Sequence, residues 1–244
     1  KMKKLSLRLL IPNIVTFFSL TLGLTSLKFA IEMKWEVSVF LVILASFLDN
    51  LDGKIARLLK SSSNFGLELD SLADFISFGV APSFIVYFWT MSGNIENSWA
   101  FVVFYAICAS SRLARFNIQS TEQKSETINK MKFFQGISTP AAAGFVLLPM
   151  MIYFRFDISI FMNPLVSVFT IVISAILMIT NIPTYSMKGI KIEKKFIPFI
   201  IIFFAGFLSL LITDFWLGMI IFISCYYLTI PIALLDKSRI HEKK

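Results

Sequence analysis

Four aspartates in an otherwise apolar sequence are the residues best suited to chemistry. Asp49 and Asp52 are three residues apart, and Asp70 and Asp74 are four residues apart. At these spacings the two side chains of each pair project from one face of a helix. Carboxylates gathered in this way repel one another unless a cation lies between them, and hard oxygen ligands suit Mg²⁺ or Mn²⁺. A pair of such ions is a common way to hold the attacking and leaving oxygens of a phosphoryl group.

Small and basic residues accompany the aspartates. Gly53 and Ala56 continue the face of the first pair, and Gly66 lies one turn before the second pair. Side chains this small let a nucleotide approach the helix backbone, and Arg57 offers a forked donor to a phosphate. The alternative role for glycine and alanine in a membrane is close packing of helices. Beside four aspartates and an arginine, we favour contact with a ligand.

The composition places these residues in a membrane protein. Of the 244 residues, 57% are hydrophobic and 16% are charged, whereas about a quarter of the residues in soluble domains are charged. Apolar stretches of about 20 residues recur along the chain, and each can cross a bilayer as a helix. Because an ionisable residue inside such a helix costs about 3 kcal/mol, each aspartate is a functional candidate.

Hydropathy predicts an all-α integral membrane fold with about eight transmembrane helices. The short polar segment 61–64 joins the second and third spans, so we expect these to be antiparallel neighbours that bring all four aspartates together near one membrane interface. The predicted spans are 10–32, 36–60, 66–91, 97–117, 138–156, 159–181, 195–213 and 215–235.

The basic residues predict the orientation. Of the 23 Lys and Arg residues, only Lys28, Lys34 and Arg155 fall on one side of the predicted topology. The positive-inside rule therefore puts both termini and the aspartates on the cytoplasmic side of the cell membrane. Attraction to membrane lipids and this topology account for the net charge of +8, so no nucleic-acid partner is expected. Residues 1–9 are expected to form a basic interfacial segment or a frayed terminus, and 237–244 a charged cytoplasmic tail.

Other catalytic residue types are scarce. The single histidine, His241, lies in the charged C-terminal tail, which excludes a histidine triad or a histidine metal site inside the membrane. Cys108 and Cys225 lie far apart in apolar segments without metal-binding spacing, so both are expected to pack. An ion-coupled transporter is the remote alternative for carboxylates in membrane helices.

The spacing of the polar residues resembles the CDP-alcohol phosphatidyltransferase family. The segment from Asp49 to Asp74 fits the family pattern DxxDGxxARx8GxxxDxxxD at every fixed position. The resemblance covers residues 10 to about 185 and implies a catalytic core of six helices, often in a homodimer. Residues 186–236 are then expected to form two additional transmembrane helices.

The resemblance implies a role for each matched residue. Asp49, Asp52, Asp70 and Asp74 are expected to hold two Mg²⁺ or Mn²⁺ ions, and Asp74 also to act as the base toward the acceptor hydroxyl. The donor substrate implied is CDP-diacylglycerol. Asn13 resembles the asparagine of the family's first helix, although it can equally bond to a neighbouring helix. The expected CDP contacts are Asn13, Asp52, Gly53, Ala56, Arg57 and Gly66.

Further segments are similar to those of family members that use L-serine as the acceptor. They span residues 70–82, 112–117 and 134–143, and the last departs from the related pattern FxGLPxPAAA at Ile137 and Ser138. The implied reaction forms phosphatidylserine and releases CMP, with Arg112 or Arg115 binding the serine carboxylate. Two alternatives stay open: the acceptor is glycerol 3-phosphate, inositol phosphate or choline, and the arginines are membrane anchors or phosphate contacts.

Overall fold

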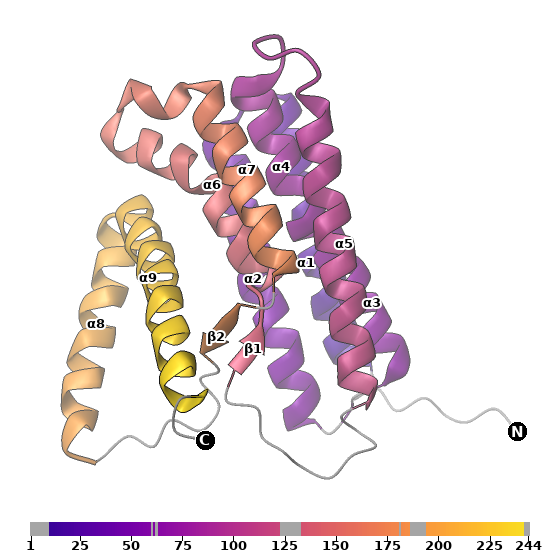
Figure 1. The fold of residues 1–244 in the computed structure, drawn as a ribbon. Coiled ribbons are helices and arrows are strands. Elements are labelled where there is room, and N and C mark those ends of the chain that lie inside the picture. The colour runs from indigo at the N-terminus through magenta and orange to yellow at the C-terminus, as the bar shows by residue number, and fades with distance from the viewer. Residues whose placement is uncertain are drawn as a thin grey trace, which may run out of the picture.

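The computed structural model describes residues 10–59, 61, 63–122, 133–180, 182–185 and 194–241. Long helices run side by side along most of this chain (Figure 1), which confirms the predicted all-α membrane fold. The predicted basic segment 1–9 and the end of the predicted tail, 242–244, lie outside the described residues.

Each helical segment overlaps one of the predicted spans. Residues 64–91 form one continuous helix with two π-helical turns, and short 3₁₀ turns precede α7 and α8. The elements are α1 Leu10–Ile31, α2 Trp35–Leu58, α3 Asn64–Asp74, η2 Phe75–Val80, α4 Ala81–Val86, η3 Tyr87–Met91, α5 Trp99–Glu122, β1 Phe133–Gln135, α6 Thr139–Phe156, η4 Ser159–Met162, α7 Pro164–Ile179, β2 Pro183–Tyr185, η5 Lys194–Phe196, α8 Ile197–Thr213 and α9 Phe215–His241.

The lengths of the helices agree with a multi-pass membrane protein. By length and composition, segments 10–31, 64–91, 99–118 and 139–156 can each cross a bilayer. The apolar helices at 164–179, 197–213 and 215–231 are shorter. Large apolar side chains such as Phe18, Phe203 and Ile212 are exposed on the outer surface of the bundle, as expected for a protein whose solvent is lipid.

A face of small residues lets α1 lie close to its neighbours. Its buried positions recur every three or four residues and are Pro12, Thr16, Ser19, Gly23, Ser26 and Ala30. The Ser19 hydroxyl donates to the carbonyl of Ala45 in α2 at 2.9 Å. Small residues and hydroxyls of this kind hold helices together in lipid, where the hydrophobic effect does not. The contact fixes α1 beside α2.

Pro82 lies just after the first of the two places where the helix at 64–91 departs from α geometry. A proline cannot donate the backbone hydrogen bond that the carbonyl four residues earlier would accept. That carbonyl belongs to Phe78, and it accepts a hydrogen bond from the buried Tyr105 hydroxyl at 3.1 Å. The first π-helical turn, at 75–80, begins directly after Asp74. Such turns inside helices are frequent at functional sites.

Two smaller elements complete the arrangement. β1 and β2 pair antiparallel, with Phe134 opposite Thr184, and thereby join the start of α6 to the end of α7. The sequence did not predict these strands. The hairpin of α8 and α9 lies at one side of the bundle (Figure 1), with α9 packed against α6. Arg155 at the end of α6 pairs with Asp214 in the turn of that hairpin.

Candidate active site

Three of the four aspartates form a compact cluster. Asp49 of α2 and Asp70 and Asp74 of α3 each offer an oxygen, and these oxygens lie within 4.8 Å of one another. The Asp49 carboxylate is within hydrogen-bonding reach of both partners. The predicted meeting of the two aspartate pairs therefore occurs, since α2 and α3 bring these carboxylates together across the turn between them.

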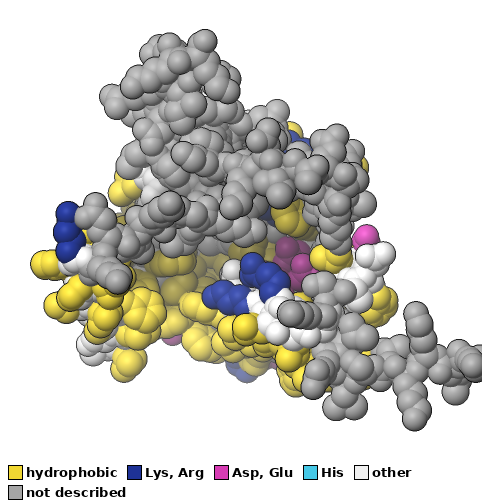
Figure 2. Space-filling model, turned by 90° about the horizontal axis from the view of Figure 1, so that it is seen from below, with side chains coloured by type: hydrophobic (Ala, Val, Ile, Leu, Met, Phe, Trp, Pro, Cys, Tyr) yellow, Lys and Arg dark blue, Asp and Glu magenta, His cyan; other side chains and the backbone are white. Residues whose placement is uncertain are grey.

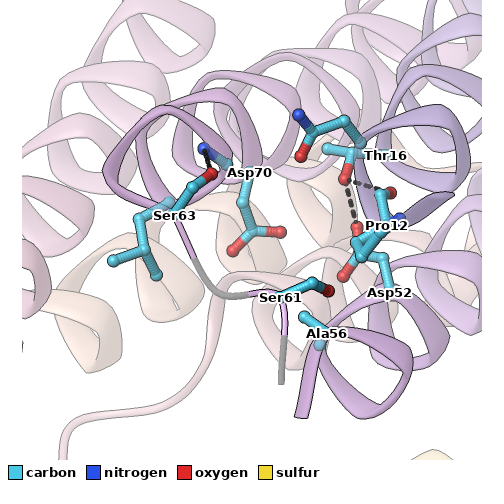
Figure 3. Close-up of a pocket in the computed structure, with 11 residues that line it drawn as sticks. Pro12, Thr16, Asp52, Ala56, Ser61, Ser63 and Asp70 are labelled. Carbon is cyan, nitrogen blue, oxygen red and sulfur yellow. Dashed lines mark hydrogen bonds between the residues drawn. The ribbon is translucent and has the colours of Figure 1, made fainter. Parts of the chain in front are cut away.

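Asp52 lies beside this cluster and not inside it. It is 5% exposed, and its Oδ2 accepts a hydrogen bond from Thr16 Oγ1 at 2.6 Å. Because α1 holds this carboxylate, Asp52 faces the adjoining pocket (Figure 3). It remains near enough to Asp70 and Asp74 for their charges to interact.

A pocket next to the cluster contains most of the predicted CDP contacts. Its lining includes Asn13, Asp52, Gly53, Ala56 and Gly66, and also Asp70 of the cluster. Arg57 is not part of this lining. The Arg57 side chain is exposed, and its Nε donates to the carbonyl of Gly53 at 3.0 Å, so it lies at the outer side of the predicted contacts.

The start of α3 is shaped to face this pocket. Ser63 caps the helix, since its hydroxyl accepts a hydrogen bond from the Gly66 N–H at 3.0 Å. A Cβ at Gly66 would lie 3.0 Å from Asn13 Oδ1, which explains why a glycine is needed for the close approach of α1. Free N–H groups at a helix start favour anions. The pocket therefore suits a phosphorylated ligand.

Arg112 lies on the other side of the cluster, next to Asp74. Its guanidinium donates to Thr139 Oγ1 at 3.1 Å. The Thr139 hydroxyl in turn donates to Asp74 Oδ2 at 3.5 Å. Thr139 thus connects the arginine on α5 with the aspartate on α3. Of the two predicted acceptor arginines, Arg112 is the one that these contacts join to the aspartates.

Arg115 has contacts of a different kind. Its guanidinium donates to the carbonyls of Ile179 at 2.9 Å and Met178 at 3.1 Å. The last carbonyls of a helix lack partners within the helix, so Arg115 stabilises the end of α7. This contact with a helix end differs from both roles that the sequence left open as alternatives, a membrane anchor and a phosphate contact.

The cluster fits a divalent cation. Asp74 Oδ1 is buried without a hydrogen-bond partner among the described residues. In the same part of the chain, the ion pairs involve Glu32 and Asp214 and none of the four aspartates. A buried carboxylate oxygen left unpaired costs free energy unless a cation or a ligand contacts it. Three clustered carboxylates, none of which forms an ion pair among the described residues, supply the oxygen ligands that Mg²⁺ and Mn²⁺ prefer.

The site includes polar residues that the sequence did not indicate. Thr16 holds Asp52, Thr139 links Arg112 to Asp74, and the buried Ser61 hydroxyl lines the pocket without a partner among the described residues. Thr16 lies one turn after Asn13, so its spacing could have indicated that it faces the same site.

Figure 2 views the molecule from the end at the bottom of Figure 1. At this end, acidic side chains are exposed beside Lys and Arg side chains.

The fold and the site define a helical membrane protein with a carboxylate cluster beside a pocket lined by small and polar residues. A model of the CDP-alcohol phosphatidyltransferase family matches residues 9–184. The chain belongs to this family.

Relatives from several bacteria share one description, CDP-diacylglycerol–serine O-phosphatidyltransferase. The protein of Mycobacterium leprae is 30% identical over 225 residues, which are 92% of this chain and 74% of that protein. The protein of Helicobacter pylori (strain 26695) is 34% identical over 194 residues, or 80% of this chain and 79% of that protein. The match to the Mycobacterium tuberculosis (strain H37Rv) protein, at 30% identity, spans 77% of this chain and 65% of that protein.

Proposed function

We propose that this protein is a CDP-diacylglycerol–serine O-phosphatidyltransferase. It transfers the phosphatidyl group of CDP-diacylglycerol to the hydroxyl of L-serine and releases CMP. The observation that carries the proposal is the cluster of Asp49, Asp70 and Asp74 directly beside the pocket lined by Asn13, Gly53 and Gly66. The shared description of the relatives supports serine as the acceptor.

The pocket binds the CDP group of the donor lipid. Gly53 and Ala56 leave the α2 backbone open to the nucleotide, and a Cβ built at Gly53 would meet no other part of the described chain within 4 Å. The N-terminus of α3 faces the negative charge of the diphosphate. Arg57, at the outer side, adds a forked donor for a phosphate oxygen.

The aspartates hold the metal ions of the reaction. Asp49, Asp70 and Asp74 provide the clustered oxygens, and Asp52 provides a further carboxylate at the boundary with the pocket. We propose two ions, Mg²⁺ or Mn²⁺, which when bound neutralise the diphosphate and stabilise charge on its oxygens. Thr16 contributes by fixing Asp52 in one orientation.

Asp74 is the proposed base. Its Oδ1 is buried and lacks a partner among the described residues, so this oxygen has a lone pair with which to accept the proton of the serine hydroxyl. The serine oxygen then forms a bond to the phosphorus that bears diacylglycerol, and the bond from that phosphorus to the CMP oxygen breaks. Positioning and charge stabilisation are sufficient for such a transfer.

Arg112 is the proposed site for the serine carboxylate. A guanidinium binds a carboxylate through two parallel hydrogen bonds, and Thr139 places this guanidinium next to Asp74. Arg115 remains the second predicted contact, but its bonds to the end of α7 support a structural role.

The wider arrangement is also part of the proposal. We place both termini and the active site on the cytoplasmic side of the cell membrane, because the basic residues gather on that side of the topology. Residues 10–185 form the catalytic core, 186–236 add two helices and 237–244 form the tail. A homodimer is the assembly implied by the family.

Release of CMP by the purified protein tests the proposal. The protein in detergent receives CDP-diacylglycerol and Mg²⁺ or Mn²⁺, together with serine, glycerol 3-phosphate, inositol 1-phosphate, choline or no acceptor. CMP release that depends on serine is the expected result. Release with another acceptor would keep the family and replace the substrate, whereas release with none of them would contradict the proposed activity.

A further inference from the structure

The hydroxyl of Ser61 is a buried polar group in the wall of the pocket proposed for CDP. Ser61 lies in the turn between α2 and α3 and is 6% exposed. It lines the same pocket as Asn13 and Gly53, yet its Oγ has no hydrogen-bond partner among the described residues. A buried hydroxyl without a partner destabilises a protein. A polar ligand in the pocket would supply the missing partner.

The second described serine of this turn differs from Ser61. The Ser63 hydroxyl also lines the pocket, but it accepts a hydrogen bond from the Gly66 N–H at 3.0 Å and caps α3. Ser61 is held by its backbone instead, because its N–H donates to the carbonyl of Ala56 at 2.9 Å. This bond fixes Ser61 at the end of α2 without using its side chain. Of these two serines, Ser61 is therefore the one whose hydroxyl remains for a ligand.

The position of Ser61 indicates which part of the ligand it meets. In the proposed function the aspartates and the start of α3 face the diphosphate, so the nucleoside lies along the face of α2 formed by Gly53 and Ala56. Asp49 of the cluster is seven residues before Ala56, which corresponds to about 10 Å along a helix. Ser61 lies beside Ala56 at the end of that face (Figure 3). A nucleoside that extends from the aspartates along α2 therefore reaches the Ser61 hydroxyl.

We propose that the Ser61 hydroxyl binds the cytidine part of CDP-diacylglycerol, which makes Ser61 a further binding residue of the donor site. The inference rests on the proposed function, because it requires a donor that carries CDP. A hydroxyl both donates and accepts hydrogen bonds, and cytidine offers partners of both kinds on its ribose and on its base. Ser61 is one of the eight residues between Arg57 and Gly66 that the family pattern leaves unspecified, so the pattern assigns it no role.

Equilibrium binding of labelled CMP to purified Ser61→Ala and Ser110→Ala tests the inference. Each variant loses one serine hydroxyl, and Ser110 is the matched control because it lies on α5, outside the pocket lining, where its hydroxyl donates to the carbonyl of Ile107 at 2.8 Å. With Mg²⁺ present, we expect Ser61→Ala to weaken CMP binding about fivefold, the usual effect of losing one neutral hydrogen bond. The affinity for cytidine, measured by displacement of labelled CMP, is expected to fall by the same factor. The KM for serine and the unfolding temperature are expected to equal those of Ser110→Ala.

The outcomes separate this inference from the proposed function. An unmodified protein that binds no CMP would overturn the proposed function and the inference together. If the unmodified protein binds CMP, equal CMP affinity in Ser61→Ala and Ser110→Ala would overturn the inference alone. Weaker CMP binding in Ser61→Ala with an unchanged affinity for cytidine would also overturn it, since the hydroxyl would then contact the phosphate and not the nucleoside.

Discussion

Asp74 differs from the other aspartates in having both a cluster partner and an unpaired buried oxygen. Replacement by asparagine keeps the shape and removes the basic oxygen. We therefore expect Asp74→Asn to lower kcat at least a hundredfold, the usual contribution of a general base, while its affinity for CDP-diacylglycerol changes less than about threefold because the pocket lies on the Asp52 side. CMP release and donor titration measure the two quantities.

Asp49→Asn is the comparison variant for Asp74→Asn. Asp49 reaches both Asp70 and Asp74, so its loss is expected to weaken metal binding and donor binding together. Calorimetric titration with Mn²⁺ measures the affinity for metal, and titration with CDP-diacylglycerol measures the affinity for the donor. Equal loss of donor affinity in both variants would contradict the division of roles between these aspartates.

The two arginines of α5 are expected to respond differently to replacement by alanine. Arg112→Ala removes the guanidinium next to Asp74 and is expected to raise the KM for serine about tenfold or more. Arg115→Ala leaves the carbonyls of Met178 and Ile179 without this donor, so it is expected to lower the unfolding temperature and to leave the KM for serine unchanged. A raised KM for serine in Arg115→Ala would restore the role that the sequence assigned to it.

At the scale of elements, the close contact between α1 and η2 is sensitive to a single methyl group. A Cβ at Gly23 would lie 2.8 Å from the backbone Cα of Ser77 and closer still to its hydroxyl. Gly23→Ala is therefore expected to destabilise the protein by about 1–3 kcal/mol, the usual cost of overpacking. Gly206→Ala on α8 is the control, since a Cβ there would meet no other part of the described chain within 4 Å. Thermal unfolding in detergent measures both, and equal unfolding temperatures would contradict the packing.

The sequence predicts the helices well and their irregularities poorly. Apolar length places the third span at 66–91, and the structure has its helix at 64–91. The π-helical turns escape prediction; at the first of them the Phe78 carbonyl accepts from a hydroxyl on another helix, Tyr105, and such a contact leaves no local pattern. The strands at 133–135 and 183–185 are each only three residues long and pair across two helices, so no local pattern reveals them.

The candidate site could also be predicted only in part from the sequence. Spacing predicts that the two aspartate pairs meet, because a helical face and a short turn determine it. It does not show that Asp52 lies beside the cluster of the other three. Spacing cannot separate Arg112 from Arg115, since their contacts depend on where α6 begins and α7 ends. It also cannot place α9, because the packing of α9 on α6 is a tertiary contact between helices far apart in sequence.

At the scale of the whole molecule, the orientation in the membrane is open to chemical labelling. Glu96 lies in the turn after η3, and Lys54 lies near the C-terminal end of α2. Both residues are exposed. In a variant with Cys108 and Cys225 replaced by alanine, an impermeant maleimide added to intact cells is expected to label Glu96→Cys and to label Lys54→Cys only after permeabilisation. The reverse pattern would contradict the placement of the active site on the cytoplasmic side.

The most direct test of the central claim follows labelled serine into lipid. The purified protein in vesicles that contain CDP-diacylglycerol receives ¹³C-labelled L-serine and Mn²⁺, and mass spectrometry identifies the product lipid. The account predicts labelled phosphatidylserine in equal amount to the CMP released, with both lost on chelation of the metal and restored when metal is added back. No labelled lipid with either Mg²⁺ or Mn²⁺, from protein that still binds CDP-diacylglycerol, would contradict it.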